Sequence, residues 1–212
     1  MNWLYQKLMQ NLYLYKIGNF ILSRSKNLLP LNIRRTIYNS LVRSHMEFGI
    51  LSFGTALDGK VKKIKQIQKK CVRNIVGCDL RSHTDPLFSK YNILKFDDLV
   101  LYNQCTFMHK LLLKKQPKSF CDFFQKTPNF DLPSTDLIRR RYIYMVDKLK
   151  NESVGRLPTA TLPRAWNSLT ENFKLTDSHS SFKKSVYNSL IDKYPISVKC
   201  NDFGCPDCHY VR

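Results

Sequence analysis

The hydrophobic positions of this chain recur mostly at the spacing of an α-helix. Through the first two dozen residues the apolar positions follow this period and predict one long helix with a wide apolar face. Pro30 disfavours helical backbone at the residue before it, so the first helix is expected to end or change direction there. A second helix is expected to begin near Asn32. This second helix is expected to separate an apolar row from a polar one, namely Ile33, Ile37 and Leu41 from Arg34, Arg35 and Asn39.

The segment from Asp58 to Gly77 has the clearest amphipathic pattern. Its positions at i, i+3 and i+4 predict a buried face made by Val61, Ile64, Gln68, Cys71, Val72 and Ile75. Its basic positions fall largely on the opposite side and are Lys62, Lys63, Lys69, Lys70 and Arg73. Asp58 suits the N-cap and Gly77 the residue beyond the C-terminus. Two interpretations stay open, a solvated lysine face over a core helix or a surface that lies along a phosphate backbone.

The rest of the chain predicts shorter helices and an irregular connection. A short helix from Thr84 leads to a long one through Leu99 and Leu113, and a last amphipathic helix is expected over residues 178–194. Three prolines interrupt residues 115–136. The predicted fold class is therefore mostly α. Its expected parts are a helical bundle over 1–115, an irregular linker over 116–136, a looser basic helical region over 137–195 and a Cys-rich tail over 196–212.

The charge is strongly positive and unevenly distributed. The net charge is +19, and the first 78 residues hold 14 lysines and arginines against two acids, Glu47 and Asp58, a surplus of 12. A field of one sign destabilises a compact state unless a polyanion screens it, which favours nucleic acid as the partner. A second basic cluster, Arg139, Arg140 and Arg141, is interleaved with tyrosines. Polar residues interrupt every apolar run near the start of the chain, so we expect no transmembrane segment and a nuclear or cytoplasmic protein that is not secreted.

Catalytic chemistry is not expected. Asp97 and Asp98 are adjacent, as in the metal-binding turn of polymerases, but the sequence around them lacks apolar hairpin strands and a third carboxylate. We expect one of these acids to cap the long helix instead. The few glycines form no phosphate-binding loop, and the scattered histidines form no catalytic motif. Neither an enzymatic activity nor a small-molecule substrate is predicted.

The cysteine spacing near the end of the chain indicates a weak metal site. Its candidate zinc ligands are Cys200, Cys205, Cys208 and His209. Cys208 and His209 are adjacent, however, and neighbouring residues do not easily serve one tetrahedral ion. Two interpretations stay open, a zinc site or free thiols. No other cofactor is expected, and the sequence gives no indication of an oligomeric state.

Several short segments, taken in order, resemble a known family. They are LNIRRTIYNSLVRSHMEFGILSFG at 31–54, IKQIQKKCVRNIVG at 64–77, LKFDDL at 94–99 and RAWNSL at 164–169, followed by the Phe182-Lys-Lys helix. This order resembles the region after the palm in jockey-like non-long-terminal-repeat retrotransposon reverse transcriptases. The resemblance implies a helical thumb and the extension that follows it, and some of these elements also end in a cysteine-bearing tail. The family's aspartate motif, fingers and endonuclease belong upstream and are not found in this sequence.

In such polymerases the thumb grips the template-primer duplex through its backbone, which matches the role indicated by the lysine-rich helix. The sequence therefore predicts a palm-less thumb region that binds RNA or RNA/DNA duplex without catalysing a reaction. The expected contacts are Arg34, Arg35, Lys62, Lys63, Lys69, Lys70 and Arg73, with Arg139, Arg140 and Arg141 in addition. Two alternatives stay open, an inactive fragment of a mobile element or a module whose apolar first helix docks a protein or an anionic membrane face.

Overall fold

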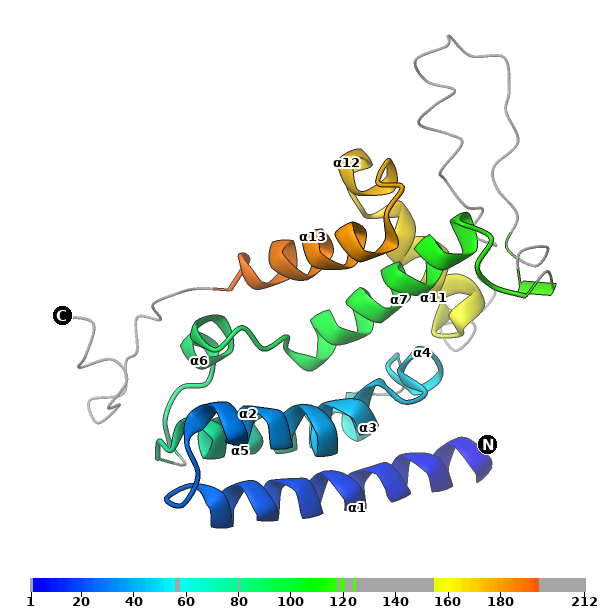
Figure 1. The fold of residues 1–212 in the computed structure, drawn as a ribbon. Helices are drawn as coiled ribbons and strands as arrows, with labels where there is room; N and C mark the ends of the chain where they lie inside the picture. Colours follow the sequence, from blue (N-terminus) through cyan, green and yellow to red (C-terminus); the bar gives the residue numbers. More distant parts are fainter. Residues whose placement is uncertain are drawn as a thin grey trace, which may run out of the picture. The chain divides into compact units, whose positions relative to one another are not determined.

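The predicted mostly α fold class is confirmed. The structure, a computed structural model, describes residues 2–55, 58–79, 81–117, 119–120, 124 and 155–194. Every regular element among these residues is a helix (Figure 1). The chain divides into a first unit, Met1–Leu99 with Ser189–Arg212, and a second unit, Val100–Asn188. These boundaries differ from the divisions that the sequence suggested at 115 and 136, and the Cys-rich tail lies outside the described residues.

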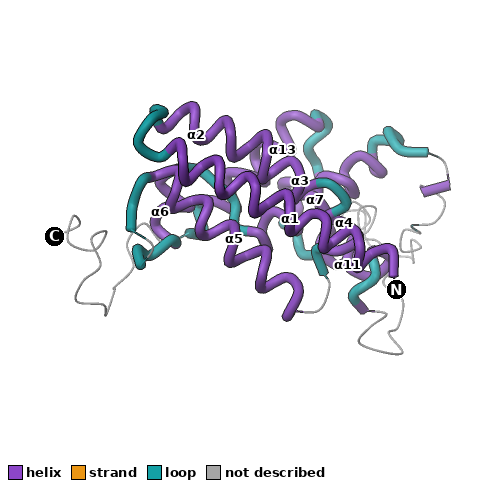
Figure 2. Tube along the Cα trace, turned by 90° about the horizontal axis from the view of Figure 1, so that it is seen from below, coloured by secondary structure: helices purple, strands orange, loops and turns teal. Residues whose placement is uncertain are grey.

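The first unit is built on three helices that pack against one another, α1, α2 and α5. Its elements are α1 (Asn2–Ser25), α2 (Leu31–Tyr38), a π-helical turn (Asn39–Arg43), α3 (Ser44–Glu47), α4 (Ile50–Phe53), α5 (Asp58–Val76), α6 (Asp85–Lys90) and the start of α7 (Phe96–Leu112). Figure 2 shows α1, α2 and α5 running side by side. Their large apolar side chains form the core and include Tyr15, Leu22, Tyr38, Val42, Ile64 and Ile75, all fully buried.

The predicted buried face of α2 is wrong. Ile33 and Leu41 are exposed, whereas Arg34, Tyr38 and Val42 are buried. These three residues are spaced four apart and therefore share one side of the helix that continues through the π-helical turn. Tyr38 and Val42 supply the large apolar surface on this side, and Arg34 is buried because it is in register with them. The sequence pattern gave the wrong face because Ile33, Ile37 and Leu41 are also spaced four residues apart, on a neighbouring side of the helix.

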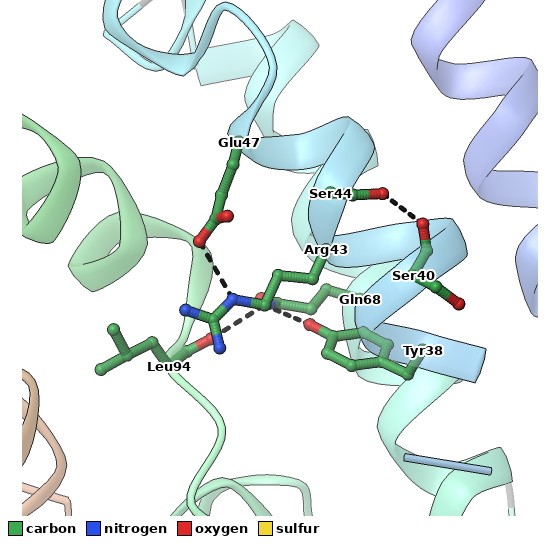
Figure 3. A network of polar contacts seen from close by, with 7 residues as sticks. All are labelled: Tyr38, Ser40, Arg43, Ser44, Glu47, Gln68 and Leu94. Carbon is green, nitrogen blue, oxygen red and sulfur yellow. Dashed lines mark hydrogen bonds and ion pairs between the residues drawn. The ribbon is translucent and has the colours of Figure 1, made fainter. Parts of the chain in front are cut away.

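A buried glutamine joins α5 to α2 and to the segment before α7 (Figure 3). Gln68 Nε2 donates to the Tyr38 hydroxyl at 3.1 Å and to the Leu94 carbonyl at 2.9 Å. A buried amide without partners would destabilise the fold, so these bonds explain why a polar residue is tolerated on the inward face of α5. In the same view Arg43 pairs with Glu47 at 3.0 Å, one helical turn away.

Gly18 lies where α1 approaches the π-helical turn. A Cβ placed on Gly18 would lie 2.6 Å from Cγ2 of the buried Val42 and 3.6 Å from Cβ of Leu41. Glycine in a helix interior costs about 1 kcal/mol relative to alanine. Here the missing Cβ allows the two segments to come close together.

The second unit holds the rest of α7 together with α11 (Pro158–Asn167), α12 (Glu171–Lys174) and most of α13 (His179–Ile191). The predicted inward residues of the last helix are confirmed, since Phe182, Val186 and Leu190 are buried. Trp166 from α11 is fully buried near Phe182, with ring centroids 5.9 Å apart. The ring of His109 stacks on Phe182 at 4.0 Å between centroids. These aromatic rings form the centre of this unit.

Two histidines of the second unit share a hydrogen bond. His109 Nε2 lies 2.8 Å from the Thr176 carbonyl, and His109 Nδ1 lies 3.1 Å from His179 Nδ1. Because Nε2 must donate to the carbonyl, Nδ1 of the neutral His109 accepts the proton of His179 Nδ1. Burial lowers the pKa of both histidines, and the charges of Lys110, Lys183 and Lys115 lower the pKa of His179 further. The pair is therefore held in its neutral form.

Candidate nucleic-acid interface

The predicted basic helix is confirmed as α5, and its end is fixed as the sequence indicated. Gly77 has a φ of +88°, a left-handed conformation that favours glycine. The amides of Gly77 and Cys78 both donate to the Arg73 carbonyl, at 2.8 and 3.2 Å. These bonds satisfy a carbonyl that would otherwise lack a partner at the helix end. The helix begins at Asp58, whose side chain lies outside the described residues.

The lysines of α5 lie on the side opposite its buried face. All the predicted inward residues are buried, which confirms this face: Val61, Ile64, Gln68, Cys71, Val72 and Ile75. We define the lysine face by four exposed side chains, Lys62, Lys63, Lys69 and Lys70. At about 100° of rotation and 1.5 Å of rise per residue, they occupy an arc of about 120° and a length of about 12 Å. The face therefore presents four cations on one side of a rigid element.

Two further basic residues of α5, Lys65 and Arg73, are engaged by the protein itself. Lys65 Nζ lies 2.8 Å from Asp97 Oδ1. Arg73 Nε donates to the Ser82 carbonyl at 2.8 Å, and its side chain is only partly exposed. Arg73 thus lies just beyond the C-terminal end of the lysine face, with part of its guanidinium already committed. Within α5 no acid follows Asp58, so no carboxylate of this helix lies three or four residues from Lys63, Lys69 or Lys70.

The prediction for Arg34 is corrected by its burial. Only 8% of Arg34 is exposed, and its Nη1 donates to the Asn74 carbonyl at 3.1 Å. Lys26 Nζ donates to the Cys78 carbonyl at 3.1 Å, just beyond the same helix end. Cations are favourable here because the carbonyls at a helix C-terminus carry partial negative charge. Arg34 therefore stabilises the fold and is not available to a duplex, whereas its neighbour Arg35 is exposed.

The adjacent aspartates are occupied by contacts within the protein. Helix α7 begins at Phe96, so Asp97 and Asp98 lie in its first turn and the expected N-cap position is wrong. Asp97 pairs with Lys65, and Asp98 accepts a hydrogen bond from the Tyr194 hydroxyl. Both acids still lie at the helix end where negative charge is favourable.

The remaining predicted site residues lie outside the described residues. They are Arg139, Arg140 and Arg141 of the second basic cluster and Cys200, Cys205, Cys208 and His209 of the tail. Across the parts of the chain that the structure describes, no cluster of three or more histidine, cysteine or acidic residues could hold a metal ion. Within those same parts, no helix combines the length and the hydropathy needed to span a bilayer.

The sequence pattern did not separate the covered part of the first helix from its uncovered part. Tyr15 and Leu22 of α1 are buried, but Tyr13, Ile17 and Phe20 are exposed. The width of the predicted apolar face was the signal that part of it stays exposed, because the two helices α2 and α5 cannot cover so wide a face.

No protein-family model, curated protein or solved structure matches this chain. The charges, exposures and contacts of its own residues therefore carry the functional inference.

Proposed function

We propose that this chain binds RNA or RNA/DNA duplex through the phosphate backbone and catalyses no reaction itself. The observation that carries the proposal is the lysine face of α5, where four cations are exposed on one side of a packed helix. A rigid row of cations contacts a polyanion without ordering long flexible loops first. Phosphate contacts position a protein on a duplex but carry no direct sequence information, so binding is expected to be independent of sequence.

The dimensions of the lysine face suit one strand of a duplex. A strand carries one phosphate for about each 3.4 Å of helix axis, so a face about 12 Å long can meet three or four phosphates. Each phosphate neutralised releases counterions and contributes about −0.9 to the slope of log affinity against log salt on DNA duplex. Full engagement of the lysine face therefore predicts a slope of about −3 to −4 from α5 alone.

The family resemblance supports the same role. A thumb of a reverse transcriptase grips its duplex through the backbone, and the segment at 64–77 that carries part of the resemblance belongs to α5. We propose that the chain derives from such a polymerase and keeps the duplex-binding part of its chemistry. An inactive mobile-element fragment would instead bind a duplex only through its net charge of +19, without a special contribution from the lysine face.

Fluorescence anisotropy with a labelled RNA/DNA hybrid, at several salt concentrations, tests this proposal. The test variant carries Lys62→Gln, Lys69→Gln and Lys70→Gln, which remove three charges and keep high helix propensity. We expect weaker binding and a salt slope that is flatter by about 3 units, since each lost phosphate contact removes about one.

A control variant separates a local contact from the effect of net charge. Lys183→Gln, Lys184→Gln and Lys193→Gln remove the same charge from exposed positions elsewhere in the chain. We expect this variant to keep most of the wild-type slope. Equal flattening by both variants, or an unchanged slope in the α5 variant, would contradict the assignment of the lysine face.

A further inference from the structure

An apolar row lies on the outer side of α1. We call Tyr13, Ile17, Phe20 and Ile21 the α1 stripe, and their exposed fractions are 66%, 39%, 59% and 37%. Spacings of four, three and one residues place them within an arc of about 100° on the helix. The buried Tyr15 and Leu22 lie on the other side, where α1 packs against α2 and α5.

The exposed apolar surface continues into the turn after α1. Leu28 is 81% exposed and Leu29 is 36% exposed, and both precede Pro30 at the start of α2. Single exposed apolar side chains are ordinary on protein surfaces. Six large ones along one helix and its following turn are the kind of patch that marks an interaction site.

The charges beside the α1 stripe indicate what kind of surface it meets. Lys16 and Arg24 are exposed next to the stripe, and the Arg24 guanidinium lies 5.3 Å from the centre of the Phe20 ring. No acid precedes Glu47 in the chain. A second copy of α1 would bring like charges together, which opposes self-association through this face. A partner complementary to the α1 stripe and its two cations therefore has an anionic surface over an apolar interior.

An acidic bilayer surface has this chemistry. A helix that lies in the plane of the membrane buries apolar and aromatic side chains in the headgroup boundary while lysine and arginine reach the anionic headgroups. The α1 stripe is one side of a helix, followed by Leu28 with 81% of its surface exposed, and such a side chain can enter a planar, deformable surface. Tyrosine and arginine combine an apolar body with a polar end and are suited to that boundary.

We propose that α1 and the turn that follows it bind the surface of an anionic lipid membrane. The α1 stripe and Leu28 enter the headgroup boundary, and Lys16 and Arg24 contact acidic headgroups. This surface is separate from the lysine face, because α5 packs against α1 and α2 through its buried face. The proposal does not depend on duplex binding.

Co-flotation of the full chain with lipid vesicles tests the proposal. Wild-type protein is expected to float with vesicles of phosphatidylcholine and phosphatidylserine and to bind far less to phosphatidylcholine alone. A variant with Ile17→Ser and Phe20→Ser is expected to lose affinity by about tenfold for each side chain. A variant with Lys16→Gln and Arg24→Gln is expected to lose about fivefold for each charge.

Phe48→Ser is the matched control, because Phe48 is 60% exposed and Phe20 is 59% exposed. It is expected to leave vesicle binding unchanged. The variant of α5 described above is expected to keep vesicle binding and to bind the duplex more weakly, so failure of one proposal is distinguishable from failure of the other. Circular dichroism of each variant shows that its helices are retained.

Three results would overturn the membrane proposal. One is full vesicle binding by the Ile17→Ser, Phe20→Ser variant. Another is equal affinity for neutral and anionic vesicles. The third is an absence of vesicle binding. This result would overturn the proposal even if the α1 stripe mediated self-association or bound an acidic helical peptide.

Discussion

The close approach at Gly18 predicts that alanine, normally the better helix former, destabilises this protein. The Cβ of Gly18→Ala would lie 2.6 Å from Val42 Cγ2, well inside van der Waals contact. Val42 is fully buried and β-branched, so it has little freedom to rotate away. Overpacking of a tight core costs about 1–3 kcal/mol, against a gain of about 1 kcal/mol in helix propensity. We therefore expect a net loss of up to about 2 kcal/mol in the free energy of unfolding.

Gly59 provides the matched control in the same unit. It lies near the start of α5, it is exposed, and a Cβ placed on it would meet nothing within 4 Å. Gly59→Ala is therefore expected to stabilise the protein by about 0.5–1 kcal/mol.

Urea denaturation followed by far-ultraviolet circular dichroism measures both variants against the wild type. The reasoning requires midpoints that shift in opposite directions with an unchanged dependence on urea. A Gly18→Ala variant as stable as Gly59→Ala would refute the claim that the missing Cβ fixes the packing of α1.

Further predictions concern the buried Arg34, its exposed neighbour Arg35 and the histidine pair. Arg34→Met is expected to lower the free energy of unfolding by about 1.5–3 kcal/mol, because it removes a charged donor from the Asn74 carbonyl, and to leave duplex affinity unchanged. Arg35→Met, at an exposed position, is expected to weaken duplex binding with little effect on stability, and the reverse pattern in urea and anisotropy titrations would contradict both assignments. The lowered pKa values of His109 and His179 mean that the unfolded chain binds protons more readily, so their stabilising contribution is complete above about pH 6.5 and is lost as pH falls below it. Urea titrations between pH 7 and 5 are expected to show that the free energy of unfolding falls by up to about 1.4 kcal/mol per pH unit for each histidine. A His109→Phe, His179→Phe variant should lose this pH dependence, and an unchanged pH dependence in the variant would assign it to other groups.

The sequence was most informative where local chemistry and periodicity agree. In α5 the apolar period, the acid-free lysine positions and Gly77 all pointed to one helix with a defined end, and each is found in the structure. These signals are local, so they need no knowledge of what the helix packs against.

The sequence was less informative where tertiary contacts decide. Ile33 and Leu41 formed as good a periodic row as Tyr38 and Val42, and only the position of α1 and α5 determines which row is buried. The burial of Arg34 depends on a carbonyl forty residues away, which no local pattern encodes. The same limit applied to α1, whose wide apolar face was predicted without knowledge of the part that its neighbours cover.

Helix α5 meets two groups of cations that respond differently to salt. Arg34 is buried where it meets a carbonyl in the last turn of α5, and Lys26 is partly buried where it meets the Cys78 carbonyl just beyond, so dissolved ions screen these contacts only weakly. The lysines on the opposite side of α5 face water, where dissolved ions compete directly with phosphates. Raising the salt concentration should therefore release a bound polyanion well before it loosens the helices. A salt titration of this protein then reports on its bound state alone, and the released protein should rebind when the salt is diluted.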